Sequence, residues 1–270
     1  MQIDYWALLP ELIVTSVACL ILLADLALRG RIRVASGYAS LVALGAALLV
    51  TVPMIGGGAR TTLAGMFVLD DFAVVTKILF LAAAFFVVWV AIPPMRGHRY
   101  EGEFYFLFLC SVLGTMLMPS SRDLLMLFIA LELVSAPAFV ITGLRKLNPR
   151  SNEAAIKFFV FGVLSAGILV YGISLVYGAT GATELSAIAA AVGPMAGDPQ
   201  PLVLVGVLFI VAAFGFKVSA VPFHFWAPDT YEGAPTPLAA FLSVASKGAG
   251  FVGLLLILVI GFADLAPFWA

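Results

Sequence analysis

The stretch PLVLVGVLFIVAAFGFKVSAVPFHFW, residues 201–226, contains the features that decide the fold. It has no charged residue before Lys217, and a membrane-spanning helix needs about 20 predominantly apolar residues. A charge at that depth is costly, so Lys217 requires a structural or functional reason. Pro222 follows five positions later and lacks a backbone N–H, so we expect the helix to break there. Broken helices are tolerated inside a membrane where they line a cavity.

The composition of the whole chain is that of a membrane protein. Of its 270 residues, 63% are hydrophobic and 11% are charged, and the mean hydropathy is +1.14. A soluble domain of this size needs more charged residues to cover its surface. The net charge of −1 gives no indication of nucleic-acid binding. We therefore expect an all-α integral membrane protein.

The sequence contains no motif for nucleotide or metal chemistry. There is no P-loop, no G-x-G-x-x-G and no H-E-x-x-H. Cys19 and Cys110 lie in separate apolar runs without the spacing of haem or iron–sulfur ligands, so we interpret them as packing residues. The chain itself is not expected to bind NADH or to carry electrons through a metal centre.

Hydropathy predicts about eight transmembrane helices. The apolar piece 185–192 is too short to span a bilayer, so we expect it at the interface or as a cap on the bundle. The predicted spans are 7–28, 34–55, 72–94, 103–118, 124–144, 154–178, 201–221 and 238–262.

The orientation follows from basic residues in the short loops, which are enriched on the cytoplasmic side. Eight of them lie in the first, third and fifth loops, and two lie in the second, fourth and sixth. This distribution predicts that the N-terminus is outside. The eight are Arg29, Arg31, Arg33, Arg96, Arg99, Arg145, Lys146 and Arg150, and the two are Arg60 and Arg122.

Four lysines fall inside predicted spans: Lys77, Lys157, Lys217 and Lys247. Lys77 lies near the outer end of its helix, so we expect its side chain to extend to the membrane surface. Lys157 lies one turn inside its span, and its position alone fits either a surface-reaching or a buried side chain. Lys247 lies in the middle of the eighth span among small residues, which leave room for water or for a closely packed helix.

Glu132 is the carboxylate for which no helix end is within reach. His224 follows the expected break and could exchange a proton near physiological pH. One interpretation is that Glu132 and the deep lysines form buried structural ion pairs. However, one carboxylate cannot neutralise three lysines, and a changing Glu–Lys distance would switch the proton on a lysine. A proton or cation path is therefore the alternative interpretation.

The loop FHFWAPDTYEGAPTP, residues 223–237, is aromatic, acidic and rich in proline. It could contain a catalytic site made of His224, Asp229 and Glu232. We favour the simpler interpretation that it is a rigid seal beside the broken helix.

Two long stretches resemble a known family. NEAAIKFFVFGVLSAGILVYGISLVYGATG (152–181) and FKVSAVPFHFWAPDTYEGAPTPLAAFLSVASKGAGF (216–251) are similar to the antiporter-like membrane subunits of bacterial NADH–quinone oxidoreductase, respiratory complex I. The motif DTYEGAPTP together with SVASKGA favours the subunit N branch. The resemblance extends over essentially the whole chain.

The resemblance implies a role for five residues. The family's fifth-helix glutamate corresponds to Glu132, its sixth-helix lysine to Lys157, and its eighth-helix lysine to Lys247. Its broken-helix lysine and the following histidine correspond to Lys217 and His224. In the family these residues line a proton half-channel that is driven by redox chemistry in other subunits.

The same resemblance implies the setting in which the chain works. We expect a subunit of a proton-translocating NADH:quinone oxidoreductase in the bacterial plasma membrane, packed against other membrane-arm subunits and the lipid bilayer. NADH, FMN, iron–sulfur clusters and quinone would be bound by the other subunits, and no cofactor is expected in this chain. A subunit of a multisubunit cation/proton antiporter is the alternative, because the same fold serves both. A purely structural membrane module is a third hypothesis.

The resemblance also predicts the domain organisation. Residues 1–102 would form an N-terminal three-helix segment, and 103–270 the first antiporter-like repeat of five helices, with the seventh helix broken. Family members carry a second, inverted repeat with a further lysine, which this sequence does not contain. We therefore expect a fragment, the product of a split gene or a truncated sequence that corresponds to the N-terminal half of the family's proteins.

Overall fold

The computed structural model describes residues 3–27, 33–195 and 197–269. Within these ranges eight helices are long and apolar enough to cross a membrane, which confirms the predicted fold class. The predicted basic loop containing Arg29 and Arg31 lies outside the described residues. The first seven spans are built on α1 (Leu9–Ala27), α2 (Arg33–Thr51), α3 (Asp71–Met95), α4 (Glu101–Leu117), α5 (Leu124–Thr142), α6 (Pro149–Thr180) and α8 (Pro201–Val218).

The eighth span, Thr236–Gly261, is a composite helix. Its α-helical parts α10 (Thr236–Phe241) and α11 (Lys247–Leu256) are each followed by a π-helical segment, Leu242–Ser246 and Ile257–Gly261. Single π turns inside helices commonly occur at functional sites. The shorter helices are α7 (Leu185–Val192), α9 (Trp226–Gly233) and α12 (Ala266–Trp269).

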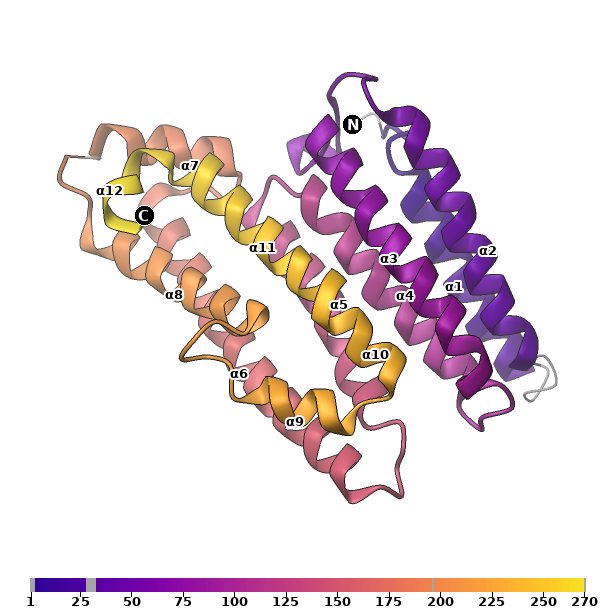
Figure 1. Ribbon diagram of the computed structural model, residues 1–270. Helices are drawn as coiled ribbons and strands as arrows, with labels where there is room; N and C mark the ends of the chain where they lie inside the picture. Colours follow the sequence, from indigo (N-terminus) through magenta and orange to yellow (C-terminus); the bar gives the residue numbers. More distant parts are fainter. Residues whose placement is uncertain (1–2, 28–32, 196, 270) are drawn as a thin grey trace.

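Helices α1 to α4 form one side of the bundle, and α6, α8 and α9 the other (Figure 1). The composite eighth helix crosses between the two sides, where α10 contacts α3 and α11 contacts α8. The fourth helix is the most buried span, with 72% of its window inside the protein. It therefore joins the N-terminal helices to the rest of the fold.

Polar side chains cap the N-termini of α3, α5 and α6. The Asp70 carboxylate accepts the Ala73 N–H at 2.8 Å before α3, and the Asp123 carboxylate accepts two backbone N–H groups before α5. Asn148 caps α6 just ahead of Pro149, and Gly181 ends that helix with φ of 69°. These caps satisfy N–H groups that lack partners within the helix, so they fix where each span begins.

A small β-hairpin connects α2 and α3, and the sequence did not predict it. Strands β1 (Arg60–Thr62) and β2 (Phe67–Leu69) pair antiparallel, with Arg60 opposite Leu69. Phe67 is fully buried and forms an antiparallel β-bridge with Ser121, which lies in the connection between α4 and α5. The hairpin thus covers one end of the helical bundle.

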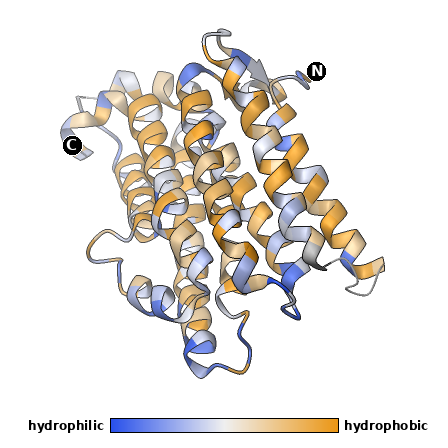
Figure 2. Cartoon of the chain, turned by 45° about the vertical axis from the view of Figure 1, so that its right-hand side comes forward, coloured by the Kyte–Doolittle hydropathy of each residue, from blue (hydrophilic) through white to orange (hydrophobic). Residues whose placement is uncertain are grey.

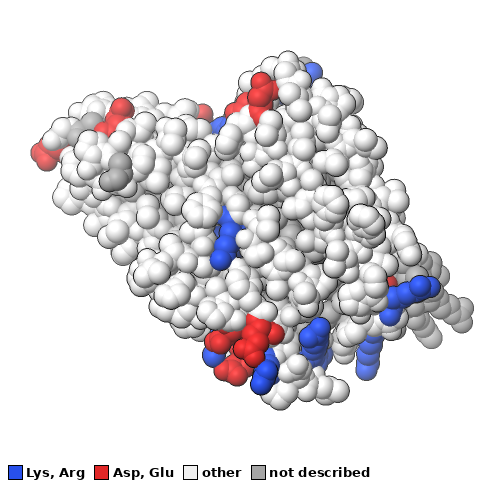
Figure 3. Space-filling model, viewed as in Figure 1, with Lys and Arg blue, Asp and Glu red and all other residues white. Residues whose placement is uncertain are grey.

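Hydrophobic residues cover the outside of the helices, and hydrophilic residues gather at the two ends of the bundle (Figure 2). A space-filling view of one face has charged groups of both signs at its upper and lower edges and a broad, mostly uncharged band between them (Figure 3). One basic patch interrupts that band. This distribution is typical of a protein whose lateral surface lies in lipid.

The helix break predicted at Pro222 is present. Helix α8 ends at Val218, Ser219 has a left-handed backbone with φ of 59°, and α9 begins at Trp226. The Val221–Pro222 peptide bond is cis. The break begins three residues before the predicted end of the span at 221.

Candidate functional site

Lys217 lies in the last turn of α8 and is only 4% exposed. Its Nζ atom donates a hydrogen bond to the Ser135 hydroxyl on α5 at 2.8 Å. Ser135 in turn donates to the Leu131 carbonyl at 2.7 Å, which leaves its oxygen lone pairs facing the lysine. The buried lysine is therefore held by one neutral partner in the centre of the protein.

Glu132 lies on the same helix as Ser135, three residues earlier, and hence on the same face. It is partly buried, and its charge interacts with that of Lys217. Among the described residues no direct ion pair joins the two side chains; Lys217 is bound to Ser135 instead. Glu132 and Lys217 are thus electrostatically coupled without being locked together.

Helix α11 completes the surroundings of Lys217. A Cβ atom added to Gly250 would lie 3.0 Å from the Lys217 Cγ atom and 3.0 Å from Val218 Cγ1. The glycine therefore allows α11 to approach the lysine stem closely. The predicted role of small residues around Lys247 is seen here, on the same helix.

Lys247 begins α11 directly after a π-helical segment and is partly buried. Its ammonium group lies 5.2 Å from the centre of the Tyr231 ring, within the range of a cation–π contact. The Tyr231 hydroxyl is buried and has no hydrogen-bond partner among the described residues. Tyr231 comes from α9, so the segment after the helix break reaches the eighth span.

Lys157 lies apart from this buried group. Its Nζ atom is 2.7 Å from Asp229 of α9 and 2.7 Å from Glu153 of α6, and its side chain is 40% exposed. A second ion pair, Arg150 with Glu232 at 3.0 Å, joins the same two helices. The acidic residues Asp229 and Glu232 of the 223–237 loop therefore pair with basic residues of α6, and the seal remains a prediction.

His224 is exposed in the turn between α8 and α9. Its ring is 5.8 Å from that of Phe225, and its carbonyl accepts the Ala227 N–H at 3.0 Å. In the part of the chain that the structure describes, no hydrogen bond joins its ring to Lys217 or Lys247. Of the five predicted residues, Lys217 is thus buried, Glu132 and Lys247 are partly buried on neighbouring helices, and Lys157 and His224 lie at the periphery.

The prediction for Lys77 was wrong. Its side chain is fully buried instead of reaching the surface, with its Nζ atom 2.6 Å from Glu11 of α1 and 4.5 Å from the centre of the Phe67 ring. The β-hairpin covers this end of α3, and Glu11 supplies a counter-charge from another helix. Both features are invisible in the local sequence around Lys77.

Sequence reasoning also missed Ser135, the direct partner of Lys217. Its spacing of three residues from Glu132 was the available signal, because it places both side chains on one helical face. For Lys157 the same kind of signal existed for Glu153, four residues earlier on one helical face, but not for Asp229, which is 72 residues away in the chain.

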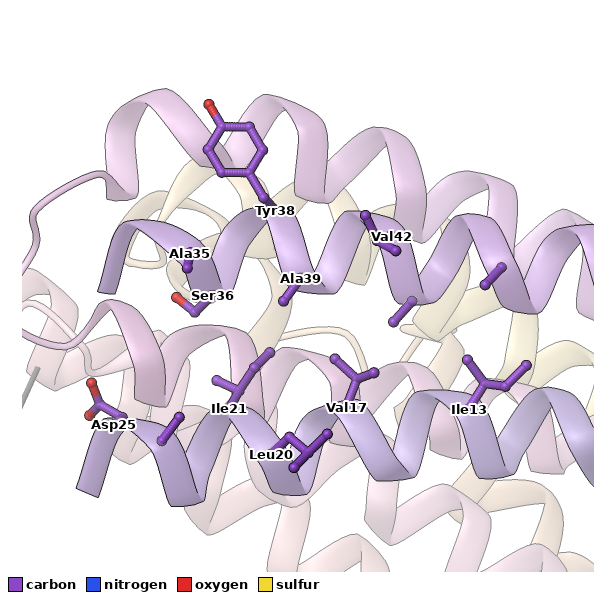
Figure 4. Close-up of a pocket in the computed structure, with 13 residues that line it drawn as sticks. Ile13, Val17, Leu20, Ile21, Asp25, Ala35, Ser36, Tyr38, Ala39 and Val42 are labelled. Atoms are coloured by element: carbon purple, nitrogen blue, oxygen red, sulfur yellow. The ribbon is translucent and has the colours of Figure 1, made fainter. Parts of the chain in front are cut away.

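A separate apolar groove of about 540 Å³ lies between α1 and α2. In Figure 4, Val17 and Ile21 of α1 face Ala39 of α2, and Asp25 and Ser36 lie at one end. Small alanine side chains of α2 leave this space open. None of the five predicted site residues lines the groove, so it is not part of the buried ionisable group.

Comparison with known proteins gives the family. Residues 121–269 match the family described as "NADH:quinone oxidoreductase/Mrp antiporter, TM". NADH-quinone oxidoreductase subunit N 2 of Streptomyces griseus is 39% identical over 274 aligned residues, which cover 99% of this chain and 51% of that protein. The chain thus spans about half the length of the curated relatives it matches.

Two solved structures have the same fold. A chain of respiratory complex I from Thermus thermophilus, solved with bound aureothin, has a TM-score of 0.76 and 32% identity, covering 92% of this chain and 52% of that one. A chain of the Mrp complex from Dietzia sp. has a TM-score of 0.78 at 19% identity, covering 97% and 50%, which is a likeness of fold alone. The chain belongs to the NADH:quinone oxidoreductase/Mrp antiporter transmembrane family.

Proposed function

We propose that this chain provides a proton half-channel in the membrane arm of an NADH–quinone oxidoreductase, as a subunit of the N type. The observation that carries the proposal is the buried Lys217, held by Ser135 and coupled to the charge of Glu132 beside a broken helix. A buried ammonium group without a locked counter-ion can change its protonation when the field around it changes. That property is what a transport path needs and a static ion pair lacks.

In this mechanism Glu132 controls Lys217. Moving a proton onto or off the Glu132 carboxylate changes the field at the Lys217 ammonium group, which lies in a low-dielectric interior where charges interact strongly. Ser135 holds the lysine in place and can donate or accept a hydrogen bond as the lysine changes its charge. The proton released by Lys217 passes toward Lys247 at the start of α11.

Two peripheral residues also have roles in the proposal. Lys157, 40% exposed between two carboxylates, contributes a fixed positive charge to the electrostatic field at the α6–α9 end of the protein. His224, exposed in the turn after α8, is the group that exchanges protons with water in the proposal. Glu132, Lys217 and Lys247 form the interior part of the path.

The proposal extends to the setting of the chain. It resides in the bacterial plasma membrane with its N-terminus outside and packs against other membrane-arm subunits. NADH, FMN, iron–sulfur clusters and quinone are bound by those other subunits, and redox chemistry there drives the proton path. Residues 1–102 act as a supporting three-helix segment, and 103–270 as the first antiporter-like repeat.

The test is a Lys217→Met substitution in the complete gene, with NADH-driven acidification measured in membrane vesicles. We expect pumping to collapse while the assembled complex remains at its normal level on native gels. Thr76→Val is the matched control, because the one hydrogen bond of the Thr76 hydroxyl to a described residue goes to the Phe72 carbonyl of its own helix, at 2.7 Å. Normal pumping by assembled Lys217→Met complexes would overturn the relay.

The same vesicles separate the proposal from the antiporter alternative. A proton path driven by redox chemistry requires NADH and quinone. A sodium-dependent pH change without either of them would instead assign the chain to a cation/proton antiporter, which the family description also includes.

A further inference from the structure

Two loops at one end of the bundle enclose a pocket that the proton path does not use. Its volume is about 620 Å³. One wall, with Arg99 and Tyr100, comes from the connection between α3 and α4, and the other, with Arg145, Lys146 and Leu147, from the connection between α5 and α6. Several basic groups lie along the lower edge of the molecule in Figure 3, beside an acidic cluster.

The pocket carries positive charge that the protein does not neutralise. Arg99, Arg145 and Lys146 are exposed, and no aspartate or glutamate is among the described residues that line the pocket. Lys146 lies 4.3 Å and Arg99 5.6 Å from the centre of the Tyr100 ring, so both cations are grouped around one aromatic side chain. The described residues provide no ion pair for any of the three.

Two basic residues nearby have acidic partners, unlike those of the pocket. Arg150, at the start of α6, is paired with Glu232, and Lys157 is paired with two carboxylates. Ion pairing at this end of the protein is thus found where α6 meets α9, whereas the three basic residues of the pocket have no acidic partner among the described residues. An unneutralised cluster of two guanidinium groups and an ammonium group is suited to a phosphate.

One exposed apolar residue that lines the pocket and another on the adjoining end of α5 indicate that the phosphate belongs to a lipid. Leu147 is 100% exposed at the rim, and Val140, in the last turn of the membrane-spanning helix α5, is 59% exposed. A free anion would have no use for these surfaces, whereas acyl chains would cover them. Basic pockets between transmembrane helices at a membrane surface commonly bind anionic lipid headgroups.

We propose that the pocket between the α3–α4 and α5–α6 connections binds the headgroup of an anionic phospholipid. Arg99, Arg145 and Lys146 contact the phosphate, and the acyl chains lie along Leu147 and the exposed end of α5. The inference does not depend on the proposed proton path, because it shares no residue with it.

The test uses the assembled complex that contains the full-length subunit, purified in detergent and stripped of loosely bound lipid. Phosphatidylglycerol is added back, and its binding is measured by lipid quantification and native mass spectrometry. For Arg99→Gln/Arg145→Gln/Lys146→Gln we expect the Kd for phosphatidylglycerol to rise about a hundredfold, because each basic residue near the membrane adds to the attraction. Arg150→Gln is the matched control, since it removes one paired charge close by, and it should bind normally.

Two further arms identify the ligand. Phosphatidylcholine should bind weakly, and inorganic phosphate at equal concentration should not displace phosphatidylglycerol; displacement by phosphate would overturn the lipid assignment in favour of a free anion. A photo-crosslinking residue at Leu147 in otherwise unaltered complex should capture labelled phosphatidylglycerol. Capture of a neighbouring subunit instead would make the pocket a protein interface, and unchanged lipid binding by the triple variant would also overturn the proposal.

Discussion

Lys77 and Glu11 form an ion pair in the interior, with the Lys77 Nζ atom 2.6 Å from Glu11 Oε1 and side chains that are 0% and 7% exposed. The pair joins α1 to α3, and the Phe67 ring of the hairpin covers the lysine. No further hydrogen bond among the described residues supports it. Each charge therefore depends on the other for its compensation.

Removing one partner of this pair should be strongly destabilising. Lys77→Met leaves the Glu11 carboxylate buried without a counter-charge, for which a loss of about 3–5 kcal/mol is typical. We expect a lower thermal unfolding temperature and less assembled complex. The double variant Glu11→Leu/Lys77→Met should recover most of the loss, because it buries apolar groups in place of both charges. A double variant as unstable as the sum of the single variants would show that the two residues are not coupled.

Ser135 provides a more specific test of the buried site than Lys217 itself. Ser135→Ala removes the hydroxyl that accepts the Lys217 hydrogen bond at 2.8 Å, and bonds to charged groups contribute about 1.5–3 kcal/mol. We expect NADH-driven pumping to fall roughly tenfold, a free-energy change of about 1.4 kcal/mol. Ser135→Thr keeps the hydroxyl and should retain most of the activity. Equal activity of the two variants would mean that Ser135 does not position Lys217.

The main architecture was predictable because hydropathy and proline act locally. The eight spans follow from apolar runs of sufficient length, and the break after α8 follows from Pro222. The position of Glu132 and Lys247 in the middle of membrane-spanning helices was predictable for the same reason, since no helix end is near either residue.

The errors concern contacts between distant parts of the chain. Burial of Lys77 depends on Glu11 in another helix and on a hairpin that has only three residues in each strand. The placement of Lys157 depends on α6, which begins at Pro149 rather than at the expected 154, and on Asp229 after the break. Neither position could be derived from hydropathy, because the deciding partners are far away in the sequence.

Helices α4 and α5 pack so closely at Gly114 that one added methyl group should force them apart. A Cβ atom at Gly114 would lie 2.5 Å from the Val134 backbone nitrogen and 2.7 Å from the Ala130 carbonyl oxygen. Backbone atoms cannot rotate away, so Gly114→Ala should destabilise the protein by about 1–3 kcal/mol or more. Gly167→Ala is the control, since nothing lies within 4 Å of its Cβ position in α6. That variant should be neutral or slightly stabilising in thermal unfolding, because alanine favours helix over glycine. Similar unfolding temperatures for both variants would contradict the close approach of the two helices.

Substituting Lys157 should reduce NADH-driven pumping only in part. Its side chain is 40% exposed and is already neutralised by Glu153 and Asp229, so water can replace part of its role at the mouth of the path. We expect Lys157→Gln to lower the rate of NADH-driven pumping only partly, in contrast to the collapse expected for Lys217→Met. Its effect on stability should be below about 1 kcal/mol, because exposed ion pairs contribute little.

The control for Lys157 is Arg150→Gln, which removes a comparable ion pair between the same two helices without touching Lys157. If α6–α9 attachment alone matters, the two variants should lower pumping equally. If the Lys157 charge itself shapes the field at the mouth of the path, its variant should be the slower, and the difference should shrink as rising ionic strength screens that charge. Complete loss of pumping in assembled Lys157→Gln complexes would mean that the lysine is an obligatory member of the path, and that water cannot replace it.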